Sequence, residues 1–121
     1  MDRKELGKKG EELAIRFLKK SGYRILLTNY ACKMGEVDII AQEKDTLAFI
    51  EVKTRTSTAF GPPQLAVNAS KQRQLSKVAL AFLKEKHLEE VKARFDVVAI
   101  LLGPQGDGIE LIRDAFDLRW G

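Results

Sequence analysis

The stretch GEVDIIAQEKDTLAFIEVKTR, residues Gly35 to Arg55, decides how this 121-residue chain folds. Two runs rich in Val, Ile, Leu, Ala and Phe flank the polar segment EKDT, a pattern typical of two strands joined by a hairpin loop. Charged residues nevertheless stand inside these runs, at Asp38, Glu51 and Lys53. Two acids and a lysine in such a segment indicate either a solvated sheet face or a functional site.

The composition is that of one globular domain. Hydrophobic residues make up 45% of the chain and charged residues 31%, which excludes a disordered protein. No apolar run approaches the ~18 residues that span a bilayer, and the first residues lack the apolar core of a signal peptide. We therefore expect a cytoplasmic protein without a membrane partner. The net charge of +4 permits nucleic-acid binding without requiring it.

The chain contains one cysteine, Cys32, and one histidine, His87. This count excludes an internal disulfide and a Cys/His zinc cluster. A metal ion would have to be held by oxygen ligands, which favours Mg²⁺ or Mn²⁺. The chain also lacks a glycine-rich phosphate loop and a Ser/His/Asp set, which argues against an enzyme of small molecules.

Hydrophobic periodicity predicts the order α-β-β-β-α-β-β, an α/β fold with a mixed sheet flanked by helices. Apolar residues at helical spacing predict helices over Arg3–Lys20 and Ser70–Lys86. The segment STAFGPP is predicted to be a loop. The predicted strands are Tyr23–Asn29, Glu36–Gln42, Leu47–Arg55, Arg94–Leu102 and Ile109–Phe116.

Strand pairing brings the charges together. If Glu43–Thr46 forms a four-residue loop, Asp38 falls directly opposite Glu51, and Glu36 falls opposite Lys53. Opposed residues have Cβ atoms ~4.5–5.5 Å apart, and like charges at that distance destabilise a sheet. A divalent cation between the two carboxylates would compensate, and Lys53 would project beside it.

The simpler interpretation is a solvated face with a cross-strand ion pair, and the pattern leaves it open. Leu47 and Phe49 share the face of Glu51, however, and acid opposes acid where a surface would pair opposite signs. Glu11 is a third acid, on the edge of the first helix's apolar stripe. It could reach the sheet, or it could be a first-turn acid that favours the helix dipole.

These residues resemble a known family. The segments GKKGEELAIRFLKKSGYRIL, GEVDII, FIEVKTR, FGPPQLAVNASKQRQL and RFDVVAI look like the YraN-like family of small bacterial proteins, over almost the whole chain. That family is usually described as predicted endonucleases. It resembles in turn the PD-(D/E)XK, restriction-endonuclease-like superfamily, and within it the archaeal Holliday junction resolvases.

The resemblance implies that residues 1–121 form a single nuclease-like domain with a restriction-endonuclease-like core. It also implies a metal-dependent endonuclease that hydrolyses nucleic-acid phosphodiesters, with DNA favoured over RNA as the substrate. The superfamily signature falls on Glu11, Asp38, Glu51 and Lys53. One departure is Val37, where many members carry a proline before the strand acid.

By this resemblance, Asp38 and Glu51 would ligate one Mg²⁺ or Mn²⁺, with the backbone carbonyl of Val52 as a further ligand. Glu11 would complete the site directly, through water or by holding a second ion. Lys53 would orient the attacking water or offset charge on the phosphate. Gln64 would orient a metal-bound water or contact a phosphate. Alternatively, Gln64 is simply a polar residue at the start of a helix.

Nucleic acid would be bound along its phosphate backbone. No segment resembles a base-reading helix, so we expect low sequence specificity. Lys71 would contact phosphate, or it could be an ordinary exposed lysine on a helix. Selectivity for branched structures and a homodimer are implied by the resemblance alone. Basic residues near or flanking the predicted site are Lys8, Lys9, Lys19, Lys20, Arg55, Lys71, Arg73 and Lys77.

Two other functions stay open at this point. The first is a non-catalytic nucleic-acid-binding module of the same fold, because a set of acids does not prove turnover. The second is a protein-interaction domain in which the charged hairpin is structural. The pattern favours the nuclease, and metal-dependent cleavage discriminates it from both.

Overall fold

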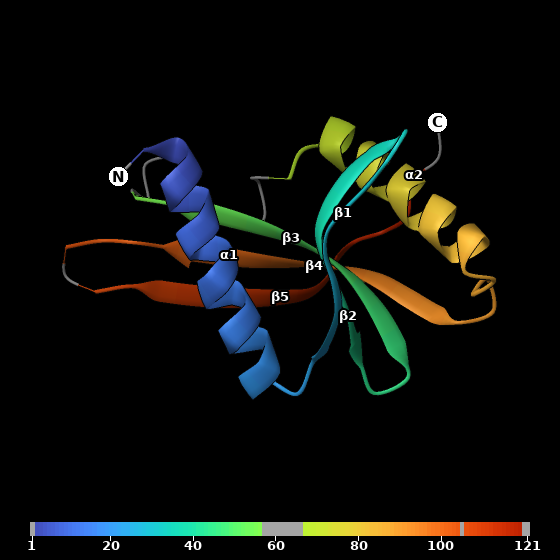
Figure 1. The fold of residues 1–121 in the computed structure, drawn as a ribbon, viewed down its shortest axis with the longest axis horizontal. Coiled ribbons are helices and arrows are strands. Elements are labelled where there is room, and N and C mark those ends of the chain that lie inside the picture. The colour runs from blue at the N-terminus through green and yellow to red at the C-terminus, as the bar shows by residue number, and fades with distance from the viewer. Residues whose placement is uncertain (1, 57–66, 105, 120–121) are drawn as a thin grey trace.

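The computed structural model describes residues 2–56, 67–104 and 106–119 (Figure 1). Within these residues five strands form one sheet in the order β1-β2-β3-β4-β5, and only β3 and β4 are parallel. The predicted α/β class and the order α-β-β-β-α-β-β are confirmed. The elements are α1 (Arg3–Lys20), β1 (Arg24–Cys32), β2 (Gly35–Glu43), β3 (Thr46–Arg55), α2 (Ala69–Glu85), β4 (Lys92–Leu101) and β5 (Gly108–Phe116).

Both helices begin at a polar cap. The Oδ1 atom of Asp2 accepts a hydrogen bond from the Glu5 backbone N–H at 2.8 Å, and α1 spans the predicted residues. Asn68 caps α2 in the same way, through the backbone N–H of Lys71. Among the described residues no helix is long and apolar enough to cross a membrane.

The two helices cover opposite faces of the sheet. Leu47 and Phe49 of β3 pack with the apolar stripe of α2, whereas the intervening Ala48 and Ile50 pack with α1. Strand alternation explains this division, because successive side chains point to opposite faces. Figure 1 shows α1 lying across β3 and β4, while α2 lies beside β1 and β2.

The β2–β3 hairpin differs from the prediction in its turn and at its open end. Glu43 pairs with Thr46, so the predicted four-residue loop is wrong and the turn has two residues, with the same register. The register pairing ends at Ile39 with Ile50. The predicted pairs of Asp38 with Glu51 and of Glu36 with Lys53 are therefore not part of the ladder. Beyond this point β2 continues with β1 toward the start of α2, and β3 runs beneath α1 (Figure 1).

The close approach of α1 to β3 depends on Gly10. A Cβ atom at Gly10 would lie 1.8 Å from the Oγ1 of Thr54, whereas one at Gly7 would meet nothing within 4 Å.

We expect Gly10→Ala to lower the free energy of unfolding by about 1–3 kcal/mol, because α1 or Thr54 must move. Gly7→Ala is the matched control and should raise it by up to about 1 kcal/mol, through helix propensity. Urea denaturation measures both, and changes of the same sign would contradict this packing.

Candidate functional site

Asp38 occupies the position where β2 leaves β3. Its Oδ2 accepts a hydrogen bond from the backbone N–H of Val52 at 2.7 Å. In a continued β2–β3 ladder Val52 would lie opposite Val37, but the pairing of these two strands ends at Ile39 with Ile50. The carboxylate thus replaces a backbone acceptor. The N–H and C=O of one strand residue point the same way, so the Val52 carbonyl faces the same gap.

Glu51 lies beside this gap on the α2 face of β3 and is 4% exposed. Its Oε2 is 3.7 Å from the Nζ of Lys53 and 3.5 Å from the Nζ of Lys71. Lys53 comes from the same face of β3, and Lys71 comes from the capped first turn of α2. The structure therefore brings together Asp38, Glu51, Lys53 and Lys71, which come from three different elements of the chain.

Two carboxyl groups meet at this point. Burial, followed by the charge of Asp38 and a hydrogen bond to it, raises the pKa of Glu51 to about 7, against the opposing effect of Lys71 and Lys53. Like-charged carboxylates that share a site cannot both ionise freely. A bound cation would remove that conflict, because its charge inverts the local preference for protonation.

The donor set fits Mg²⁺ or Mn²⁺. Asp38, Glu51 and the Val52 carbonyl offer only oxygen atoms, the ligands that these hard cations prefer. Within the described part of the chain no three His, Cys, Asp or Glu residues are grouped to hold a metal ion. A complete protein cage is thus not formed there. Mg²⁺ is commonly bound through one or two carboxylates, with water and substrate phosphate as its other ligands.

Glu11 does not join the acids of the sheet. It belongs to α1, which covers the face opposite Glu51. Its Oε1 accepts a hydrogen bond from the Nδ2 of Asn29 at 2.8 Å. In the structure Glu11 therefore contacts Asn29, and its part in a cation site stays a prediction.

The remaining residues predicted for the site are Gln64 and the basic residues. Gln64 and the STAFGPP segment lie within residues 57–66, outside the described residues. Lys8 and Lys9 are exposed in the first half of α1, whereas Lys19 and Lys20 are in its last turn, roughly 16 Å along the axis. Arg55 ends β3, and Arg73 and Lys77 follow Lys71 along α2.

Two features of this region escaped prediction. Asn29 was expected to end a strand, but β1 continues to Cys32 and Asn29 contacts Glu11. Lys71 was expected to contact phosphate, with nothing in the sequence to place it beside Glu51. The signal for Asn29 was its low strand propensity inside an apolar run. Lys71 had no local signal, because the contact depends on how α2 packs.

A second group of charges lies on the α1 face and centres on Asp96, which is 0% exposed. Its Oδ2 accepts from the Tyr23 hydroxyl at 2.7 Å, and its Oδ1 accepts from the Nε of Arg94 at 3.0 Å and the backbone N–H of Asp114 at 2.9 Å. Burial, followed by the hydrogen bond and charge of Asp96, raises the pKa of Tyr23 to about 12. Arg94 also donates to Glu43. The group joins the end of α1 to three strands, which indicates a structural role.

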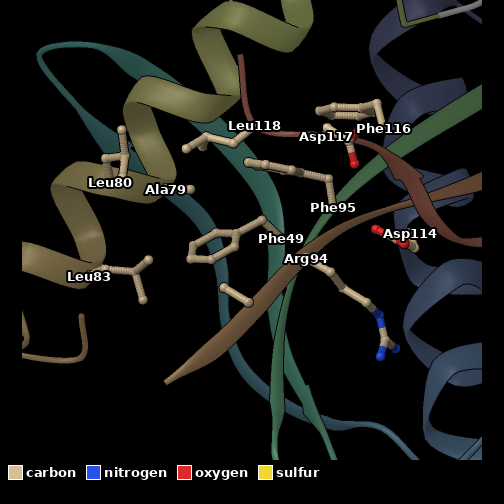
Figure 2. Close-up of a pocket in the computed structure, with 11 residues that line it drawn as sticks. Phe49, Ala79, Leu80, Leu83, Arg94, Phe95, Asp114, Phe116, Asp117 and Leu118 are labelled. Carbon is tan, nitrogen blue, oxygen red and sulfur yellow. The ribbon is translucent and has the colours of Figure 1, made fainter. Parts of the chain in front are cut away.

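A pocket of about 200 Å³ lies between α2 and the β4–β5 side of the sheet (Figure 2). Figure 2 shows the rings of Phe49, Phe95 and Phe116 along it, with the guanidinium of Arg94 turned away from them. Asp38, Glu51 and Lys53 are not among its lining residues. We therefore place the candidate site at the gap between β2 and β3, not in this pocket.

The likeness of this chain to solved structures is distant. The chain is similar, over 78% of its length and 36% of the other chain, to the "Structure of EndoMS-dsDNA2 complex". The sequence identity is 20% and the TM-score is 0.45.

Sequence relatives are much closer. A UPF0102 protein of Syntrophus aciditrophicus is 53% identical over 115 residues, 95% of this chain and 91% of the relative. A UPF0102 protein of Geotalea daltonii is 53% identical over 120 residues, 98% of this chain and 94% of the relative. Residues 10–100 also match the model of a family described as uncharacterised. The chain therefore belongs to the uncharacterised protein family UPF0102.

Proposed function

We propose that this protein is a Mg²⁺- or Mn²⁺-dependent endonuclease that hydrolyses phosphodiester bonds in DNA with low sequence specificity. The observation that carries the proposal is the group around Glu51: a buried carboxylate beside Asp38, with two lysine ammonium groups within 4 Å. The sequence resemblance to PD-(D/E)XK enzymes supports the same function, since Asp38, Glu51 and Lys53 supply its strand signature.

Each side chain has a defined role in this proposal. Asp38 and Glu51 would hold the cation, with the carbonyl of Val52 directed to the same gap. The bound cation would polarise the scissile phosphate and lower the pKa of a coordinated water. Lys53 orients the attacking water or offsets charge on the phosphate as the bond breaks.

The start of α2 favours an anion at this place. Its first turn contains no acid, and the partial positive charge of a helix N-terminus attracts phosphate. Lys71 adds a full charge there, within reach of Glu51. A phosphate between Lys71 and Lys53 would replace their ion pairs with Glu51, and the Glu51 carboxylate would then be available to hold the cation. Low specificity follows because such contacts reach the backbone and not the bases.

We expect Lys53→Ala to reduce metal-dependent cleavage about a hundredfold, the usual cost of losing one group that stabilises the transition state. Lys84→Ala is the matched control, since Lys84 is in the last turn of α2 and should leave cleavage unchanged. Supercoiled plasmid, linear duplex, single strands, four-way junctions and RNA are incubated with each protein in Mg²⁺, Mn²⁺ or EDTA.

The outcomes of this assay separate the competing functions. Cleavage that requires the metal and falls only in Lys53→Ala supports the nuclease and identifies its preferred substrate. Equal cleavage by all three preparations indicates a contaminating nuclease. Retention of one DNA form without cleavage, lost as salt is raised, indicates the non-catalytic binding module instead.

A further inference from the structure

Asn29 has a backbone conformation that its surroundings do not explain. Lys44, His87 and Asp114 share its positive φ, but each has an evident reason: the hairpin turn, the turn after α2 and a backbone hydrogen bond to buried Asp96, respectively. Asn29 has a φ of 53° within β1 and its side chain is exposed. Left-handed backbone is uncommon outside glycine, although asparagine adopts it more readily than most residues, and such positions cluster at functional sites.

The side chain of Asn29 has one hydrogen bond that crosses between elements. Its Nδ2 donates to the Oε1 of Glu11 at 2.8 Å and so links β1 to α1. An exposed hydrogen bond of this kind contributes little to folding, because water offers both groups equivalent partners. Its main effect is to restrict the Glu11 carboxylate, which would otherwise turn freely toward solvent.

The strand register places Asn29, and with it the Glu11 carboxylate, beside the strand that contains Asp38. Thr28 pairs with Ile39, and Tyr30 pairs with Val37, so Asn29 lies across from Asp38 in the β1–β2 register. Asp38 in turn contacts Val52 and Glu51 at the gap between β2 and β3. The amide therefore ties Glu11 to the strand that flanks the candidate cation ligands.

We propose that Asn29 is a positioning residue, which holds the Glu11 carboxylate on the β1 side of Asp38 so that Glu11 supports the cation site through water. This inference rests on the proposed function. Glu11 belongs to a helix on the other face of β3 from Glu51, and the hydrogen bond from Asn29 joins its carboxylate to β1. An amide suits this task, because it donates to a carboxylate without adding charge.

The test is a double-mutant cycle with metal affinity as its main measurement. Asn29→Gly keeps the left-handed backbone accessible and deletes the amide, and Glu11→Gln removes the charge that the amide positions. Titration of the protein with Mn²⁺, followed by the paramagnetic resonance of the free ion, gives the affinity of each single variant and of the double variant. Plasmid cleavage and the urea midpoint are measured in parallel.

We expect Asn29→Gly to weaken Mn²⁺ binding about tenfold, the scale on which partners of metal-site groups act. In the Glu11→Gln background it should have no further effect, because Asn29 acts through Glu11. The urea midpoint should not fall. Lys44→Gly is the control: it places glycine at another positive φ, in the hairpin turn, and should leave Mn²⁺ binding unchanged.

Other results would overturn the inference. Wild-type affinity in Asn29→Gly means that Asn29 positions nothing, and independent effects of the two substitutions mean that it does not act through Glu11. A fall in affinity that follows a lower urea midpoint assigns Asn29 a structural role. If the wild-type protein neither binds Mn²⁺ nor cleaves DNA, that result overturns the proposed function, and this inference with it.

Discussion

Glu51→Gln should abolish metal-dependent cleavage and, in the same preparation, make the metal-free protein more stable at pH 8. Cleavage should fall by about a thousandfold or more, since the charge stabilisation that a bound cation supplies is worth several kcal/mol. The substituted amide would offer the cation no negative charge, while it could still donate a hydrogen bond to Asp38. Glutamine has nearly the shape of glutamate, so the packing of β3 against α2 should be retained.

The gain in stability follows from the pKa of Glu51. The folded value of about 7 lies above the ordinary value of 4.5, so the folded protein holds this proton over a pH range in which the unfolded chain has lost it. The contribution of protonated Glu51 is therefore full below about pH 4.5 and is lost as the pH rises through 7. At pH 8 the ionised carboxylate costs about 2–3 kcal/mol, which Glu51→Gln avoids.

Urea denaturation in EDTA between pH 4.5 and 8 measures this effect beside the plasmid assay. The wild-type stability should fall relative to Glu51→Gln as the pH rises. Glu110→Gln, the same change at an exposed position of β5, should alter neither cleavage nor this difference. Full activity in Glu51→Gln would refute the assignment of the cation site. Inactivity with lower stability at every pH would assign Glu51 a structural role.

Asp96→Ala should destabilise the fold by about 3–5 kcal/mol, because it leaves Arg94 and the Tyr23 hydroxyl without their buried partner. The backbone N–H of Asp114 loses its acceptor as well. Such a loss is a large part of the 5–15 kcal/mol by which domains are usually stable, so this variant is expected to unfold at much lower urea or not to fold.

Tyr23→Phe keeps the prediction testable if Asp96→Ala does not fold. It removes one hydrogen bond to the carboxylate and should cost about 1.5–3 kcal/mol. Asp45→Ala is the control for the loss of an aspartate charge, since Asp45 pairs with Lys92 in solvent and its removal should have no measurable effect. A Tyr23→Phe protein as stable as the wild type would show that the buried group does not hold α1 to the strands.

The sequence predicted those parts of the fold that depend on local pattern. The helical stripe and its cap define α1 from Arg3 to Lys20, and alternation sets the β2–β3 register. It did not predict where the ladder ends. Whether β2 stays with β3 beyond Ile39 depends on the twist of the whole sheet and on the packing of both helices, which no short window contains. The replacement of a strand acceptor by Asp38 depends on the same divergence.

For the candidate site, the sequence predicted contacts within one hairpin but not contacts between distant elements. Residues of one hairpin could be brought together by register alone, and Asp38, Glu51 and Lys53 do lie together. Contacts between elements could not be predicted in this way, as for Lys71 with Glu51 and Asn29 with Glu11. The buried Asp96 was overlooked because its strand reads as almost wholly apolar, although an acid in such a strand requires partners.

The parallel pairing of β3 with β4 determines when during biosynthesis the site can be completed. Every pair in this ladder joins residues 46 positions apart, from Thr46 with Lys92 to Arg55 with Leu101. The hairpins of β1, β2 and β3 need only short loops, whereas the β3–β4 contact must first repay the entropy of closing a long one. A nascent chain therefore contains Asp38 and Glu51 well before α2 and β4 have left the ribosome. Lys71 and β4 emerge later than the β2–β3 hairpin, so an unfinished chain contains the two acids without the complete candidate site.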